Sequence, residues 1–345
     1  MSLKYNKVLG IGGIGVGMLF HTDINETLGR SESRLVELSE AKDYCKLHIV
    51  FHYIAELLSP DAKVYPIGYV GDDANGEKLI DEMNQAGMKT DFIKVHPKSP
   101  TVISICLQYP DKEGCNFTSV NGANEKVNVD YVKNSMEEII VNDSSIVAAI
   151  PEVSVDSRIS ILKEGHEKGG FCVLSVPVSE AEEFKASGVF KYCDLLAVNE
   201  EEAIAIIGSK FPTEEIAVEL YEYIKDYNSD MLLLITCGNK GAYSVSKGNI
   251  EFIPPMPAQV INTTGAGDAC LGGTIAAIAM GIPFQKGIND SKFGQTPIAS
   301  AVELGTLCAG MAIECEDSIA KYVSKKTILQ KIKKENWEVE PWFIN

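Results

Sequence analysis

The residues with the clearest chemical potential lie in the segment VINTTGAGDACLGG, residues 260–273. Gly265, Ala266 and Gly267 have little or no side chain, and a helix of small residues is expected to follow at 269–281. Backbone N–H groups at a helix N-terminus form an anion site together with the helix dipole, and phosphate is the natural anion. Asp268 would repel a resting anion, which favours a role as the base for a hydroxyl that attacks the phosphate. The alternative is an acid that only caps its own helix.

A second candidate is the pair His48 and His52 in the expected helix 47–58. Their spacing of four residues places them on one helix face. A metal pair is disfavoured because the sequence offers no third ligand of the H-E-x-x-H kind. Direct contact with a substrate and ordinary helix or lid packing both stay open.

The glycine-rich segment GIGGIG, residues 10–15, matches the dinucleotide pattern G-x-G-x-x-G. That pattern also needs a helix that opens at once and an acid after a second strand. The residues that follow predict neither, so an NAD enzyme is a minor alternative. We interpret the segment as a strand end at which glycines such as Gly13 let a ligand or a lid come close.

Short apolar runs alternate with longer helical patterns along the chain. Buried strands are expected at 7–12, 63–71, 144–151, 171–177, 194–199 and 231–238, and helices at 76–87, 157–169 and 213–227. This alternation predicts an α/β fold, a three-layer sandwich whose mostly parallel central sheet is flanked by helices. Ligands of such sheets bind at the carboxyl ends of the strands.

Two segments, 18–39 and 91–120, interrupt this alternation. The first is polar and irregular, and the second contains an alternating, β-branched stretch that is typical of antiparallel strands. We expect them to form a small β-sheet beside the main one, as a lid. No linker or repeat divides the chain, so residues 1–345 are expected to be a single domain.

The composition excludes several classes of function. The net charge of -17 argues against nucleic acid and anionic membranes as partners. The nine scattered cysteines form no C-x-x-C pair and suit a reducing cytoplasm better than a disulfide framework or a zinc site. The apolar N-terminal run is rich in glycine, which favours a first strand over a signal peptide. No run reaches the roughly 18 apolar residues of a membrane span.

Five motifs in order resemble the ribokinase-like, or PfkB, carbohydrate kinase family. NTTGAGD at 262–268 is similar to the specific C-terminal signature of that family. The other four are individually weaker but collinear, and the resemblance covers about residues 7–315. They are GYVGDDANGEKL at 68–79, NGAN at 121–124, DLLAVNEEEA at 194–203 and LITCGNKGAY at 234–243.

The resemblance implies a role for each matching position. The backbone of Gly265, Ala266 and Gly267 would stabilise the transferring group, and Asp268 would be the general base. Asn199 and Glu202 would place Mg²⁺, through water, beside the phosphates of ATP. The nucleotide would be lined by Thr236, Gly238, Gly241 and Thr264, and the acceptor by Gly13, Gly17, His48, His52 and Asn124. The lid of this family often makes a dimer contact, so a homodimer through the lid is a further expectation.

The sequence departs from the family pattern mainly on the acceptor side. Asn262 replaces the acid that commonly helps to hold a monovalent cation, which leaves activation by K⁺ unsupported. Gly17 stands where the family usually has an acid that grips sugar hydroxyls. Leu47 and His48 replace two glycines of the usual helix start, and His52 replaces its asparagine.

These residues together predict a cytoplasmic small-molecule kinase. It would transfer the γ-phosphate of ATP, with Mg²⁺, to a hydroxyl of a sugar or sugar-like acceptor, with Asp268 as the base. A nucleoside kinase of the same fold is the alternative among enzymes. A non-catalytic ligand-binding protein is the alternative outside them, and the intact Gly265–Asp268 segment argues against it.

Overall fold

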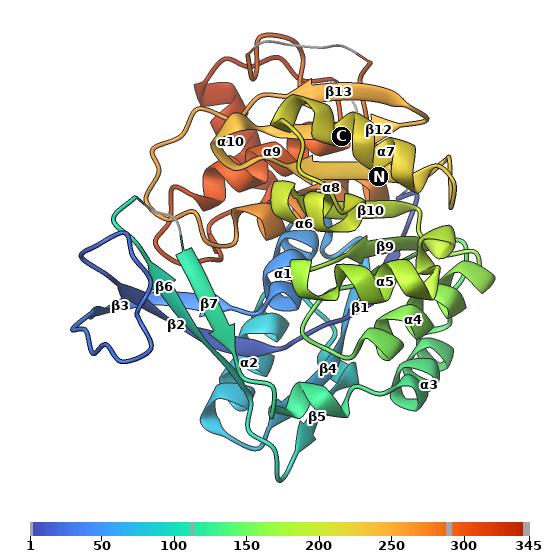
Figure 1. Ribbon diagram of the computed structural model, residues 1–345. Coiled ribbons are helices and arrows are strands. Elements are labelled where there is room, and N and C mark those ends of the chain that lie inside the picture. Colours follow the sequence, from blue (N-terminus) through green and yellow to red (C-terminus); the bar gives the residue numbers. More distant parts are fainter. Residues whose placement is uncertain (1–2, 112–113, 288–291, 341–345) are drawn as a thin grey trace.

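The computed structural model describes residues 3–111, 114–287 and 292–340. Its centre is a nine-stranded sheet in the order β13-β12-β11-β10-β9-β8-β1-β4-β5 (Figure 1). The strands from β11 to β5 in this order pair in parallel, and β12 and β13 are antiparallel. The strand bounds are β1 Lys7–Ile11, β4 Lys63–Gly71, β5 Ile93–His96, β8 Ser145–Ala149, β9 Phe171–Ser175, β10 Leu195–Asn199, β11 Leu232–Thr236, β12 Ala242–Ser246 and β13 Asn249–Ile253.

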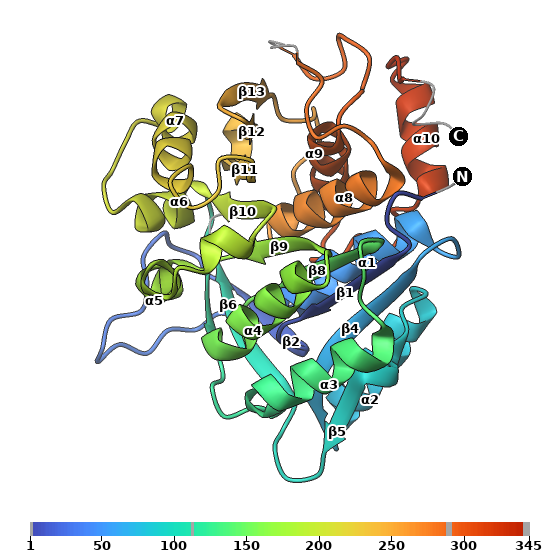
Figure 2. The ribbon, with the colours of Figure 1, turned by 90° about the vertical axis from the view of Figure 1, so that its right-hand side faces the viewer.

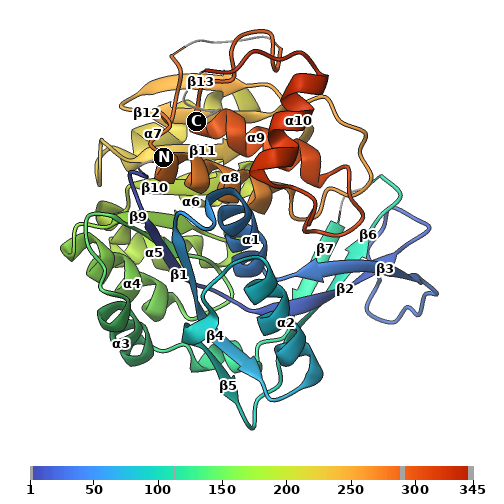
Figure 3. The same cartoon turned by 180° about the vertical axis from the view of Figure 1, so that it is seen from behind.

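Helices cover both faces of this sheet (Figures 1, 2 and 3). One face carries α3 Val129–Ile139, α4 Val155–Glu167, α5 Ala181–Ser187, α6 Glu200–Ile207 and α7 Thr213–Ile224. The other carries α1 Lys46–Leu58, α2 Ala74–Gln85, α8 Ala266–Met280, α9 Ala301–Ala312 and α10 Lys325–Lys334. Each face buries its own apolar cluster against the sheet. The predicted three-layer sandwich is confirmed, and all six predicted strands occur.

A separate four-stranded sheet lies beside this body, in the order β3-β2-β6-β7 (Figures 1 and 3). Its strands are β2 Gly15–His21, β3 Glu37–Tyr44, β6 Val102–Gln108 and β7 Gly114–Thr118. The predicted lid bounds need correction, because the sheet begins at Gly15 and its first half extends to Tyr44. Ile93–His96 is not part of it. That strand pairs in parallel with the end of β4, because burial of Ile93 completes the apolar cluster at the edge of the central sheet.

The two faces of the small sheet differ in polarity. Register partners share a face, so Gly17, Asp43 and Ser104 point to the same side, which we call the inner face. Buried polar side chains lie along it: Asp43, Ser104 and Gln108. The outer face carries exposed apolar side chains from each of the four strands: Met18, Leu38, Ile105 and Phe117.

The small residues of α8 serve the packing of helices. A Cβ built on Gly272 would lie 2.6 Å from the Val50 carbonyl oxygen in α1, and one on Gly273 would lie 3.0 Å from Gly305 Cα in α9. Glycine therefore lets three helices approach closely. This packing holds α8 rigidly between its neighbours, and its N-terminus is held with it.

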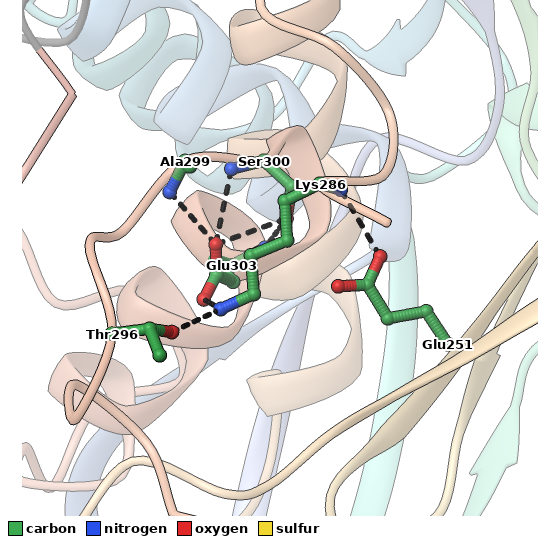
Figure 4. A network of polar contacts seen from close by, with 6 residues as sticks. All are labelled: Glu251, Lys286, Thr296, Ala299, Ser300 and Glu303. Carbon is green, nitrogen blue, oxygen red and sulfur yellow. Dashed lines mark hydrogen bonds and ion pairs between the residues drawn. The ribbon is translucent and has the colours of Figure 1, made fainter. Parts of the chain in front are cut away.

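A buried ion pair ties the segment after α8 to the body (Figure 4). Lys286 Nζ lies 2.7 Å from Glu303 Oε1 in α9 and donates to Thr296 Oγ1 at 2.8 Å. The second oxygen of Glu303 accepts from the N–H groups of Ala299 and Ser300. The Lys286 N–H donates to Glu251 in β13, so one residue connects the segment to two elements.

Two expectations from the sequence concern the cysteines and membrane-spanning segments. The nine cysteines are all free thiols. Within the described residues, no helix combines the length and the apolar character needed to cross a bilayer.

Candidate active site

The start of α8 has the geometry of an anion site. Gly265 precedes the helix with a left-handed φ of 78°, and a Cβ there would lie 2.5 Å from the Ser318 carbonyl oxygen, so only glycine fits. The Ala266 N–H is used by the turn, since it donates to the Thr263 carbonyl at 3.3 Å. The next two N–H groups, of Gly267 and Asp268, belong to the first turn, whose donors have no intrahelical acceptor. The N–H groups of Gly267 and Asp268 are therefore the donors that we expect to face an anion, and the predicted set Gly265–Gly267 stays a prediction.

Asp268 has the properties of a base that works near neutral pH. Burial raises its pKa to about 6; the Lys46 ammonium opposes this shift, and the charges of Glu202 and Asp43 add to it. A base is most effective when its pKa lies near the working pH. The residue that caps the helix is Gly265, which has no side chain for a capping hydrogen bond.

Lys46 is a site residue that the sequence reasoning missed. It is the first residue of α1, and its Nζ lies 3.5 Å from Glu202 Oε1. Burial lowers its pKa, but Asp268, Glu202 and Glu152 outweigh that effect and raise it. A lysine at a helix N-terminus opposes the helix dipole, and this was the available signal. The Lys46 ammonium thus interacts with the carboxylates of Asp268 and Glu202 and with that of Glu152.

Asn199 and Glu202 form a capping box at the start of α6. The Glu202 N–H donates to Asn199 Oδ1 at 2.8 Å, and the Asn199 N–H donates to Glu202 Oε2 at 2.8 Å. The other oxygen of Glu202 faces Lys46. Among the described residues no three His, Cys, Asp or Glu side chains form a metal cage. Mg²⁺ usually keeps several waters and binds one or two carboxylates plus substrate phosphates, so Glu202 fits an outer role.

The loop after β11 lies beside the anion site. A Cβ on Gly267 would have Thr236 Oγ1 as its nearest neighbour, at 3.9 Å. Gly238 has a φ of 55° and open space beside it, as a nucleotide loop needs. Gly241 has a φ of 113° and packs against the Ile253 carbonyl, so its glycine is required by the fold. Thr264 donates its N–H to Asn262 Oδ1 at 3.0 Å.

Asn262 does not fit a cation site. Its side chain is buried, and its Nδ2 donates to the Glu316 carbonyl at 2.7 Å. Its Oδ1 accepts from Gln108 Nε2 of β6 and from the Thr264 N–H, both at 3.0 Å. The amide therefore satisfies a carbonyl that a cation could have bound. It also joins the small sheet to the loop before α8.

The region predicted to bind the acceptor, called the acceptor side below, contains three alternating glycines, and a side chain from another segment faces each of them. A Cβ on Gly13 would lie 2.5 Å from Glu152, and one on Gly15 would lie 2.8 Å from Cys45 Sγ. A side chain at Gly17 would collide with the Asp43 carboxylate. Glu152 follows β8 with a left-handed φ of 76°, and burial raises its pKa to about 7. The Asn124 amide donates to the Glu152 carbonyl, which brings two predicted positions, 13 and 124, to one place.

The charges that act on His48 and His52 come from residues other than these carboxylates. Both are buried on α1, where His48 packs edge-on against Tyr44 at 4.6 Å between ring centroids. Burial lowers the pKa of both, that of His52 to about 4. The charged side chains that act on them are Lys321 and Glu82, and neither belongs to the site. Helix packing, one of the two alternatives that stayed open, describes these surroundings, and direct contact with a substrate stays a prediction.

The glycine segment 10–15 does not open a helix. β1 ends at Ile11, and Gly15 begins β2 of the small sheet. The dinucleotide pattern requires a helix at this point, so the NAD alternative loses its structural basis.

Comparison with known proteins finds carbohydrate and nucleoside kinases by sequence and by structure. The family model described as pfkB family carbohydrate kinase matches residues 50–325. A ribokinase of Schizosaccharomyces pombe is 26% identical over 67% of this chain and 72% of its own length. A pseudouridine kinase of Escherichia coli is 24% identical over 74% of this chain and 75% of its own. The structure of an Arabidopsis thaliana ribokinase complexed with ribose and ATP has a TM-score of 0.69 and 18% identity, and the match covers 95% of this chain and 99% of that one.

Proposed function

The chain belongs to the pfkB family of carbohydrate kinases, and from that premise we propose how its residues perform the transfer. It is an ATP-dependent kinase that phosphorylates a hydroxyl of a small molecule. Asp268 accepts the proton of the attacking hydroxyl. The N–H groups of Gly267 and Asp268 stabilise the charge that develops on the transferring group. The observation that carries this proposal is a carboxylate with a pKa of about 6 at the N-terminus of a rigidly packed helix.

The other charged residues have supporting roles. Lys46 offsets the negative charge that gathers when ATP meets the carboxylates of the site. Glu202 would hold Mg²⁺ through water when the ion binds with the nucleotide, and the capping box with Asn199 fixes the direction of the Glu202 carboxylate. Mg²⁺, when bound, neutralises charge on the phosphates. Thr236 and Gly238 line the phosphate end of ATP. K⁺ is not required, because the Asn262 amide takes the contact that a cation would make.

The acceptor is a sugar or a sugar-like polyol. A nucleoside is the second candidate, because the pseudouridine kinase is nearly as similar to this chain as the ribokinase is. The free thiols suit the cytoplasm, where such acceptors are found.

The outer face of the small sheet is the surface through which two copies pair. Leu38 and Phe117 are 59% and 69% exposed there, next to Met18 and Ile105. Apolar side chains gathered on one exposed sheet face mark an interaction site. Sedimentation of the wild type and of Phe117→Asp tests this: the wild type should sediment as a dimer and the variant as a monomer.

The function is tested by ADP release from ATP and Mg²⁺ across sugars, polyols, sugar acids and nucleosides. Turnover that requires both one acceptor class and Asp268 supports the proposal. ATP binding without turnover on any acceptor would contradict it and favour the non-catalytic alternative.

A further inference from the structure

Asp43 fills the space that the absent side chain of Gly17 leaves open. The two residues are register partners in the antiparallel pair β2–β3, so their side-chain directions share the inner face of the small sheet. The Asp43 carboxylate lies against Gly17 so closely that any side chain at position 17 would collide with it. An acid that appears to be missing from one strand is thus supplied by the neighbouring strand.

The surroundings of Asp43 are those of a binding group. Its side chain is 8% exposed, and its Oδ2 accepts from Cys106 Sγ at 2.9 Å. Its Oδ1 is buried without a hydrogen-bond partner among the described residues. A buried charged oxygen without a partner is costly, and a ligand that donates a hydrogen bond removes the cost. The charge of Asp43 contributes to the raised pKa of Asp268, so the two carboxylates are near one another.

A second buried oxygen, Glu152 Oε2, also lacks a partner in the described part of the chain. Lys46 is the cation beside the cluster of Asp43, Glu152 and Asp268, and Glu202 already approaches it. The buried Arg158 guanidinium also interacts with the charge of Glu152, but it is paired with Glu180. This balance of charge favours an acceptor that donates hydrogen bonds and carries no negative charge.

We propose that Asp43 is the acceptor-binding carboxylate of this kinase and that it selects uncharged polyhydroxy acceptors over anionic ones. The inference rests on the proposed function and deepens it. Asp43 accepts hydrogen bonds from acceptor hydroxyls through Oδ1, while Cys106 fixes the rotamer through Oδ2. The acceptor hydroxyl that reacts then lies between Asp43 and Asp268.

The first test compares Asp43→Asn with the wild type. The substitution keeps the size of the side chain and an acceptor for Cys106. We expect the KM of the acceptor to rise at least about tenfold, with the KM of ATP and the melting temperature unchanged. Glu40→Gln is the matched control, because Glu40 is an exposed residue of the same strand. An unchanged acceptor KM in Asp43→Asn would overturn the proposal even if the wild type is an active kinase.

The second test measures selectivity, which a merely structural role would not change. Glucose is compared with glucuronate and uridine with orotidine; each pair keeps the sugar ring, and the second member carries a carboxylate. The wild type should prefer the neutral member by at least about tenfold in kcat/KM, and Asp43→Asn should narrow that ratio. Equal use of both members by the wild type would overturn the selectivity.

The third test transfers the carboxylate from position 43 in β3 to position 17 in the neighbouring strand β2. Asp43→Gly should lose acceptor affinity, and the double variant Gly17→Asp with Asp43→Gly should recover part of it. No recovery in a double variant that folds would overturn the assignment. If the wild type turns over no acceptor, the proposed function fails separately, and calorimetry with the same sugars still decides: binding that weakens in Asp43→Asn supports the role of Asp43, whereas equal binding or none contradicts it.

Discussion

The proposed phosphate side and the proposed acceptor side of this site are built in different ways. The phosphate side takes its groups from short continuous segments, 262–268, 199–202 and 236–241, each at the end of a strand or the start of a helix. The acceptor side takes Asp43, Cys45 and Glu152 from β3, the start of α1 and the loop after β8, and gathers them around bare glycines. The phosphate side depends on local backbone geometry, so its residues recur at recognisable spacings in the sequence. The acceptor side depends on side chains from distant segments, so the sequence contains no such spacing for it.

Asp268→Asn should break the phosphate side alone and give the largest effect. The amide cannot accept the proton of the attacking hydroxyl, so kcat should fall at least about 10²-fold while ATP affinity changes little. Steady-state kinetics with calorimetric ATP binding measures both. Asp81→Asn, an exposed acid of α2, is the control and should keep full rate. An Asp268→Asn enzyme of normal rate would disprove the role of the base.

The pH profile should show which side limits activity in acid. Because the pKa of Asp268 is raised to about 6, its carboxylate gains a proton as the pH falls through that value and the base is lost. The kcat/KM should therefore be flat above the pKa and fall about tenfold for each pH unit below it. Glu152→Gln should keep this limb. If that variant removes the limb, protonation of Glu152 on the acceptor side is responsible instead.

Lys46→Met should affect both sides, since Lys46 lies between them. We expect a loss in kcat/KM of about tenfold, with the KM values of ATP and acceptor both raised. Lys46 lowers the pKa of Asp268, so the acid limb should also move to higher pH in this variant. Lys46→Arg keeps the charge and should keep the limb in place. If the acid limb of the pH profile does not move in Lys46→Met, Lys46 has no effect on the pKa of Asp268.

Removal of K⁺ should have the smallest effect. With K⁺ replaced by tetramethylammonium, the rate should stay within about twofold, because the Asn262 amide already binds the Glu316 carbonyl. Asn262→Asp removes that donor and places a carboxylate beside the carbonyl, so this variant should be slow without K⁺ and recover with it. A wild type that needs K⁺ would contradict the assignment of Asn262.

The sequence predicts most of the main sheet and the start of α8 well because their signals are local. Apolar runs with glycine, proline or asparagine borders predict six of the nine described strands of the central sheet, all but β5, β12 and β13, and 265–268 predicts a helix start. Lys46, Asp43 and Glu152 could not be predicted in the same way, because each acquires its neighbours only when distant segments meet. The opposite holds for His48 and His52. Their spacing in the sequence indicates a functional site, whereas in the structure they are buried and pack against Tyr44 and Tyr53. Gly272 and Gly273 were expected only as part of a small-residue helix. That they allow α1 and α9 to approach α8 closely is seen only in the structure.

The central position of β1 has a consequence for how the chain folds during synthesis. β1 leaves the ribosome before both of its partners, since it pairs with β4 on one side and with β8, residues 145–149, on the other. Its second edge therefore stays open until more than a third of the chain has been made. Such an apolar open edge is a template for wrong pairing, and non-local pairing is slow. A nascent chain that stalls before β8 thus exposes a strand that is almost entirely buried in the folded protein, and exposed apolar strand edges of this kind are the ones that chaperones protect from aggregation.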